Sequence, residues 1–297
     1  MASFALCIGI NNYPGTDMDL AGCVNDASDW AAELGARGFA VRTLLDAEAT
    51  KAAMVAAMRE VIAIAIAGDL VAITFSGHGT YVFDTDDSSD GRGDEPDGFD
   101  EALCPHDVQA SGDPLTDDEI HALFAARASG VRLLLIADSC HSGTVSRAVP
   151  GAAGVGPRKR FLPPAHWMKT AQLARALAEP ARDFAHTGAS AFTLAAGRGG
   201  DVTEAAAGGA HNPPLDDVLL AGCQEGKLNF SYDAVFATRP NGAFTFHALK
   251  ALRGLPPGAT YADWHAAITP EFLPTTEYPQ TPQMVAIDAA KRRPVLD

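Results

Sequence analysis

The chain has 297 residues, of which 47% are hydrophobic, so it holds enough apolar material to bury a sizeable core in one large or two small domains. No apolar run approaches the ~18 uninterrupted residues of a transmembrane helix, and this favours a soluble globular protein. The formal net charge of -15 disfavours nonspecific binding to nucleic acids or anionic membranes, because their phosphates would be repelled.

Cysteine usage indicates a reducing compartment. The cysteines are odd in number and have no CxxC spacing, so they predict neither a disulfide framework nor a zinc site; they are Cys7, Cys23, Cys104, Cys140 and Cys223. The first residues, from Met1 to Phe4, carry no basic region of the kind that opens a secretion signal. We therefore expect a cytoplasmic protein.

Strands and helices alternate through the first quarter of the sequence. Apolar runs at 4–10, 40–45 and 70–75 are strand candidates, and helices are expected between them at about 25–36 and from Thr50 to about 67. This alternation predicts an α/β fold with a mostly parallel central sheet, right-handed crossovers and flanking helices.

Later segments have weaker signals. Residues 84–101 hold nine carboxylates against one base, which suits either a solvated surface loop or a functional lid or ion site. Residues 149–164 are rich in Gly, Ala and Pro around Arg158-Lys-Arg160 and indicate an exposed linker. The remaining candidates are helices at about 116–128, 173–178, 242–252 and 261–268 and strands at 133–137 and 191–196.

Two buried strands end in small polar turns that carry reactive side chains. The run 70–75 leads into Ser76-Gly-His-Gly79, and the run 133–137 leads into Asp138-Ser-Cys-His-Ser-Gly143. If the two strands are neighbours, His78 and Cys140 face each other at the carboxyl edge of the sheet. An imidazole in that position can take the thiol proton and pass it to a leaving group, while the backbone N–H groups of Gly79 and Cys140 can hold an oxyanion.

These two motifs resemble the signatures of the caspase-fold cysteine peptidases, and specifically those of bacterial metacaspases, also called orthocaspases. The resemblance extends to Leu20–Asp26, Gly98–Leu103 and Gln280–Gln283. It implies a single large domain made of a p20-like catalytic part (1–146), a linker (147–185) and a p10-like part (186–297) that completes the same sheet. It also implies a monomer that acts on proteins or peptides.

Carboxylates near the nucleophile bear on specificity. Asp138 stands two residues before Cys140, and Asp26 follows the first strand; if both reach the crevice, a guanidinium or ammonium is the matching partner. By resemblance, Cys23, Asp26, Ser76 and Asp138 match positions that shape a pocket for basic residues. We expect cleavage after Arg, and more weakly after Lys. Three of these four residues also have a purely structural alternative: Asp26 as a charge at a helix terminus, Asp138 as a turn cap, and Cys23 as simple packing.

The resemblance also raises the question of a metal. It implies a Ca²⁺ site at Asp100, Asp117 and Asp118, with a further acid seven residues after the nucleophile, where this chain has Arg147. Oxygen ligands suit Ca²⁺, but a cation at one ligand position weakens the case. Thr116 and Glu119 form a capping box that opens a helix, and acids in its first turn suit the helix dipole, which explains Asp117 and Asp118 without a metal. No cofactor is required for thiol chemistry.

Three hypotheses about function are weighed in turn against the sequence. The first is a cysteine endopeptidase with a Cys140/His78 dyad, which can cut itself in the basic linker, with Arg160 as the first candidate. The second is a noncatalytic caspase-like regulatory or binding module; two intact motifs count against it. The third, a nucleotide-binding domain, lacks a Gly-rich phosphate loop after the first strand, because Ile10–Gly15 has neither GxGxxG nor a P-loop.

Overall fold

A computed structural model describes residues 1–83, 99–140, 157–169, 217–223, 230–268 and 280–297. Its centre is a six-stranded sheet in the order β12-β9-β7-β3-β1-β2. These strands are β1 (Ser3–Gly9), β2 (Ala40–Leu45), β3 (Leu70–Ser76), β7 (Arg132–Asp138), β9 (Val218–Ala221) and β12 (Gln283–Val285). All neighbours pair in parallel except β12 and β9, which are antiparallel. The expected mostly parallel α/β sheet is confirmed.

The strands β7, β3 and β1 in the middle of the sheet are apolar because both of their faces are covered. β3 is buried along its whole length, and alternate residues of β1 enter different cores. Leu6 and Ile8 join the cluster that includes α2 and α4, whereas Ala5 and Cys7 join the cluster that includes α1, α6 and α7. The period-2 alternation of a strand thus links two cores through one sheet.

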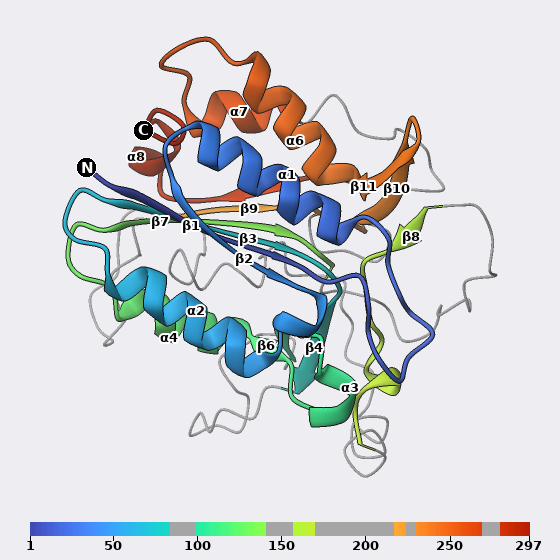
Figure 1. The fold of residues 1–297 in the computed structure, drawn as a ribbon. Helices are drawn as coiled ribbons and strands as arrows, with labels where there is room; N and C mark the ends of the chain where they lie inside the picture. Colours follow the sequence, from blue (N-terminus) through green and yellow to red (C-terminus); the bar gives the residue numbers. More distant parts are fainter. Residues whose placement is uncertain (84–98, 141–156, 170–216, 224–229, 269–279) are drawn as a thin grey trace.

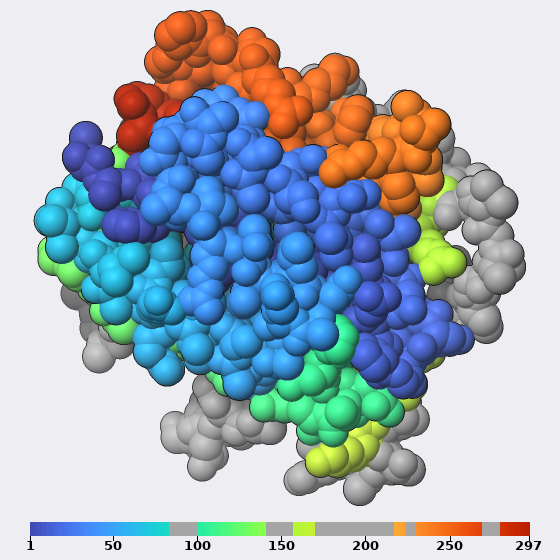
Figure 2. Space-filling model, in the orientation of Figure 1, coloured from blue at the N-terminus to red at the C-terminus, as the bar shows by residue number. Residues whose placement is uncertain are grey.

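Helices cover the two faces of the sheet in separate groups (Figure 1). On one face lie α1 (Cys23–Ala36), α6 (Ala243–Gly254) and α7 (Tyr261–Ile268), where Trp30 and Trp264 meet edge to face at 6.0 Å. On the other face lie α2 (Lys51–Ala63) and α4 (Asp117–Ala125). Figure 2 shows the C-terminal elements seated directly against α1, so the two ends of the sequence share one core.

Two small antiparallel sheets flank the carboxyl edge of the main sheet. One contains β4 (Gly79–Phe83), β5 (Phe99–Leu103) and β6 (Leu115–Thr116); the other contains β8 (Arg158–Lys159), β10 (Tyr232–Phe236) and β11 (Arg239–Gly242). The sequence did not predict either of them, nor β9 as the neighbour of β7. The expected helix at 173–178 and strand at 191–196 lie outside the described residues.

Short elements complete the description: α3 (Val108–Ser111), α8 (Asp288–Lys291) and the 3-10 turns η1 (Asp46–Glu48) and η3 (Pro164–His166). None of the helices that the structure describes has the length and apolar character needed to cross a membrane.

Candidate active site

His78 and Cys140 lie just beyond two paired strands. β3 and β7 are in register so that Ser76 is opposite Asp138, and each motif residue follows two positions later. Both side chains are fully buried. The two motifs therefore lie at one edge of the sheet, as expected, and the pairing of the two side chains stays a prediction.

The imidazole of His78 is fixed from two sides. The backbone N–H of His78 donates to the Tyr13 hydroxyl at 2.7 Å, and the centroids of the Tyr13 and His78 rings lie 4.7 Å apart. Its Nε2 lies 2.6 Å from the carbonyl oxygen of Met18, which can only accept, so Nε2 carries the proton and Nδ1 is the basic nitrogen. Burial lowers the pKa of His78 to about 4, and the Met18 contact opposes this shift. At neutral pH the ring is uncharged and able to accept a proton.

The thiol of Cys140 is also buried. Its Sγ accepts a hydrogen bond from the backbone N–H of Ser231 and lies 3.5 Å from the Ser231 carbonyl oxygen and 3.4 Å from Sγ of Cys223. Burial, with a further contribution from Cys223, raises the pKa of Cys140 well above its usual value. In this state the sulfur is held as a thiol.

A carbonyl group already sits between the two predicted oxyanion donors. The oxygen of Arg160 accepts hydrogen bonds from the N–H of Gly79 at 3.0 Å and from the N–H of Cys140 at 3.1 Å. The strand that delivers it is held like an added β-strand, since β8 pairs antiparallel with β10 and the Arg160 N–H donates to the Ser231 carbonyl at 2.9 Å. Beyond Arg160, the N–H of Leu162 donates to the Gly79 carbonyl at 2.9 Å.

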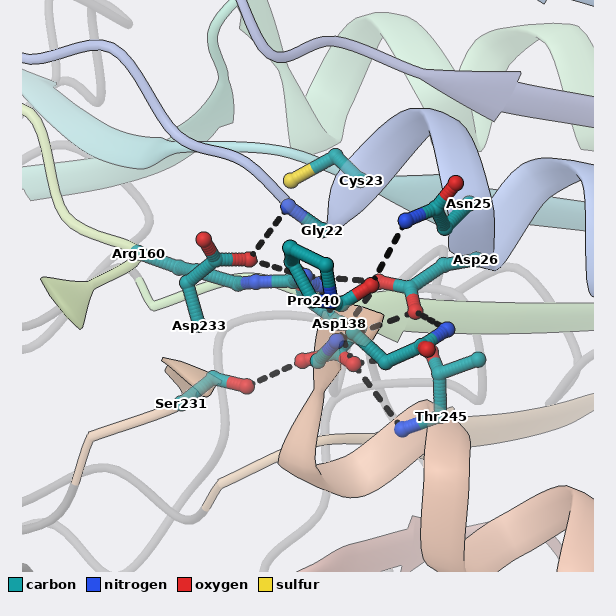
Figure 3. Close-up of polar contacts among 12 residues, drawn as sticks. Gly22, Cys23, Asn25, Asp26, Asp138, Arg160, Ser231, Asp233, Pro240 and Thr245 are labelled. Carbon is teal, nitrogen blue, oxygen red and sulfur yellow. Dashed lines mark hydrogen bonds and ion pairs between the residues drawn. The ribbon is translucent and has the colours of Figure 1, made fainter. Parts of the chain in front are cut away.

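The side chain of Arg160 fills a pocket of carboxylates (Figure 3). Its Nη2 lies 2.6 Å from Asp26 Oδ2 and 3.0 Å from Asp233 Oδ1, and its Nη1 lies 3.1 Å from Asp138 Oδ2. The arginine is 0% exposed. Although burial disfavours the charge, Asp138 and the neighbouring acids raise the pKa of Arg160 well above its usual value.

Each carboxylate is held by groups other than the arginine. Asp26 accepts the Gly242 N–H at 3.0 Å and the Asn241 amide at 2.9 Å. Asp138 accepts the N–H and hydroxyl of Thr245 at 2.9 and 2.7 Å and the hydroxyl of Ser231. Burial raises the pKa of Asp26 to about 7, although Arg160 opposes that shift. The pocket is preorganised, because fixed donors orient its acids.

The other two residues predicted to shape the pocket are Cys23 and Ser76. Cys23 begins α1 beside Gly22, and burial raises the pKa of its thiol well above the usual value, although the charge of Arg160 opposes that shift. Ser76 is buried at the end of β3, opposite Asp138. The expectation of an exposed linker is wrong at Arg160, since the acids of the pocket stabilise its buried charge.

The predicted calcium ligands occupy the neighbouring small sheet. Asp100 lies in β5 opposite Val82, and Asp117 and Asp118 open α4 behind the predicted capping box, which is present. Among the residues that the structure describes, no group of three or more His, Cys, Asp or Glu side chains could hold a metal ion. Arg147 and the acids of 84–98 lie outside those residues, and the calcium site stays a prediction.

Sequence reasoning missed several groups at the site. Tyr13, the Met18 carbonyl, Ser231 and Asp233 carry no motif, and they reach the site only through long-range packing. The sequence pattern predicts only that Gly242 starts a helix, yet a Cβ there would lie 2.5 Å from Arg160 Nη1. Its identity was the one available signal, because a glycine can mark a close approach.

Comparisons with known proteins agree on one family. The description "Metacaspase, peptidase C14 domain" matches residues 4–148. Metacaspase-1A of Neurospora crassa is 31% identical over 296 residues, which cover 94% of this chain and 62% of the fungal protein. Metacaspase-7 of Arabidopsis thaliana is 38% identical over 153 residues, which cover 48% of this chain and 35% of the plant protein.

A solved structure matches over nearly the full length. The crystal structure of protein GSU0716 from Geobacter sulfurreducens has a TM-score of 0.66 and 30% sequence identity, covering 99% of this chain and 98% of that chain. The curated relatives are longer, since this chain spans 62% of the Neurospora protein and about a third of the Arabidopsis protein.

Proposed function

We propose that this chain, which is similar to metacaspases, is a cysteine endopeptidase that cleaves after arginine, and less readily after lysine. We further propose that one of its substrates is its own Arg160–Phe161 bond. The observation that carries both proposals is the conformation of Arg160, whose guanidinium pairs with Asp26, Asp138 and Asp233 while its carbonyl oxygen accepts from Gly79 and Cys140.

The proposed chemistry uses the two motif residues. His78 takes the thiol proton, and the sulfur of Cys140 attacks the carbonyl carbon of the arginine to form a tetrahedral intermediate. The N–H groups of Gly79 and Cys140 stabilise its oxyanion, and each such donor is worth roughly 10²–10³ in rate. The C–N bond then breaks, His78 protonates the leaving amine, and water hydrolyses the thioester.

Preference for arginine over lysine follows from the geometry of the acids. A guanidinium presents several N–H groups in a fixed fork, so Nη1 and Nη2 can pair with separate carboxylates at once. A lysine ammonium is a single point charge and would leave part of the set unpaired. Acidic side chains would be repelled, which supports cleavage after basic residues instead of after aspartate.

We also propose the compartment, the substrate class and the oligomeric state. All five cysteines are free, which supports a reducing cytoplasm as the compartment. Protein or peptide substrates follow from the peptidase family, and the monomer that the resemblance implied remains part of the proposal.

The test is hydrolysis of fluorogenic peptides that end in Arg, Lys or Asp, with and without calcium, by the wild type and by Cys140→Ala. We expect hydrolysis in the order Arg, Lys, Asp by the wild type only. Equal activity of Cys140→Ala, or hydrolysis after Asp, would contradict the proposal. Complete inactivity of a folded wild type toward all three would favour a noncatalytic module.

A further inference from the structure

The residue before Arg160 also has a specific partner. The ammonium of Lys159 lies 3.8 Å from the centroid of the Phe230 ring. Phe230 is 8% exposed and packs with Tyr232 and Cys140 in one small cluster, so its face is fixed in position. An ammonium over a fixed aromatic face gains a cation–π interaction, which is strongest where water is partly excluded. Lys159 is an exposed residue, and partial desolvation of its ammonium lowers its pKa.

Asp233 supplies a third carboxylate that neither motif contains. It lies in β10, its Oδ1 is 3.0 Å from Arg160 Nη2, and it is 6% exposed. It also accepts the N–H groups of Ala21 at 2.8 Å and Gly22 at 2.9 Å, which fixes both of its oxygens. Figure 3 shows Asp233 approaching the guanidinium from the side opposite Asp26.

Both side chains belong to one stretch, residues 230–233, that lies along β8. Between them, the Ser231 carbonyl accepts the N–H of Arg160, and Tyr232 and Asp233 pair with Lys159 and Arg158. Since side chains alternate along an extended chain, this stretch presents an aromatic face to one basic residue and a carboxylate to the next.

We propose that residues 230–233 select substrates with two consecutive basic residues. Phe230 recognises the residue before the cleaved arginine, and Asp233 pairs with the guanidinium of the cleaved arginine together with the other acids. This substrate class rests on the proposed function and narrows it from single basic residues to basic pairs.

Binding measurements test this selection without catalysis. The full chain carrying Cys140→Ala and Arg160→Gln cannot cut and has lost its own charged occupant, so a labelled peptide containing Arg-Lys-Arg can enter the site. Replacing the middle lysine by norleucine keeps most of the stem and removes the charge. We expect affinity to fall between about two- and thirty-fold, as cation–π energies imply.

Two variants assign the effect to this stretch. Adding Phe230→Leu removes the ring, and we expect the lysine and norleucine peptides then to bind within about two-fold of each other. Adding Asp233→Asn should reduce by about ten-fold the preference for arginine over neutral citrulline at the last position. A melting curve for each variant checks that the fold is retained.

Substitution of the first arginine by norleucine is the matched control for general attraction to an acidic protein. Arg158 donates to the Asp19 carbonyl at 2.5 Å, whereas the ammonium over the ring is that of Lys159, so Phe230→Leu should leave this substitution's effect unchanged. Equal binding of the lysine and norleucine peptides, a preference that survives Phe230→Leu, or no binding of the basic peptide would overturn the inference. Tight selective binding with no hydrolysis by the wild type would overturn the proposed activity instead.

Discussion

Arg160 carries a charge that it cannot lose, yet none of its side chain reaches solvent. Burying an ion costs several kcal/mol unless partners compensate, and here the partners are Asp26, Asp138 and Asp233. One guanidinium offsets only part of the charge of three acids. The pocket is therefore suited to cations, and an empty pocket would hold close like charges.

Gly242 gives this pocket its size. An added Cβ would lie 2.5 Å from Arg160 Nη1 and also meet Asp138, while the backbone of Gly242 has an ordinary negative φ of -67°. We predict that Gly242→Ala raises KM for arginine peptides at least ten-fold and abolishes cleavage after Arg160, as measured by peptide hydrolysis and intact mass. Gly254→Ala, whose Cβ meets nothing within 4 Å, is the control. Unchanged KM in Gly242→Ala would show that the arginine side chain binds elsewhere.

His78 makes stability depend on pH. Its pKa is lowered by burial from 6.5 to about 4, so the unfolded chain binds a proton in this window that the folded chain does not. Stability is therefore present above pH 6.5 and is lost as the pH falls toward 4, by ~3 kcal/mol for this group. Urea unfolding of Cys140→Ala at several pH values, with and without His78→Gln, measures the difference. Parallel curves for the two proteins would contradict the assigned environment.

At the scale of single elements, the proposed function implies that β8 fills the groove that a substrate strand would use. It pairs with β10, and its following residue occupies the acid pocket. The intact chain is therefore expected to exclude other peptides until β8 is cut or released.

This occupancy predicts a lag. Freshly purified wild type should hydrolyse an added arginine peptide slowly at first, and the rate should rise in step with cleavage after Arg160. Arg160→Gln should show no lag, because the acids no longer retain the segment. The exposed Arg59→Gln on α2 is the control and should keep the lag. An identical lag in Arg160→Gln and wild type would argue against occlusion by β8.

The elements that the sequence predicted well are those with strong local signals. β3 and β7 are continuous apolar runs that end in motif residues, and the capping box of Thr116 and Glu119 marks the start of α4. Their neighbours depend on long-range pairing. β9 has only four residues, and its place beside β7 follows from a partner some 80 positions away.

The same distinction applies to the site. Asp26 and Asp138 were predictable as a basic-residue pocket because each lies beside a recognisable motif. Asp233 was not, because it reaches the pocket only when β10 packs against the loop before α1. The occupant of the pocket could not be predicted either. Composition marks Arg160 as a cleavage site, but its burial among the acids depends on partners 22 to 134 residues away.

At the scale of the whole molecule, a cut after Arg160 would not divide the fold. Fragment 1–160 contains β1, β3, β7 and α1, whereas fragment 161–297 contributes β9, β12 and α6 to the same sheet and core. Trp30 of the first packs on Trp264 of the second.

We therefore predict that the cut chain remains one particle. Its two fragments should co-elute at the position of the intact protein in size-exclusion chromatography and separate only in denaturant. Uncut Cys140→Ala supplies the reference elution position. Separate elution of the fragments under native conditions would mean that the shared sheet does not hold them together.

The most direct measurement of the central claim is the intact mass of the purified protein during incubation, with N-terminal sequencing of any new fragment. The account predicts that wild type yields a fragment beginning at Phe161, and that Cys140→Ala and Arg160→Gln do not. A wild type that hydrolyses arginine peptides rapidly yet keeps its Arg160–Phe161 bond through long incubation would contradict it.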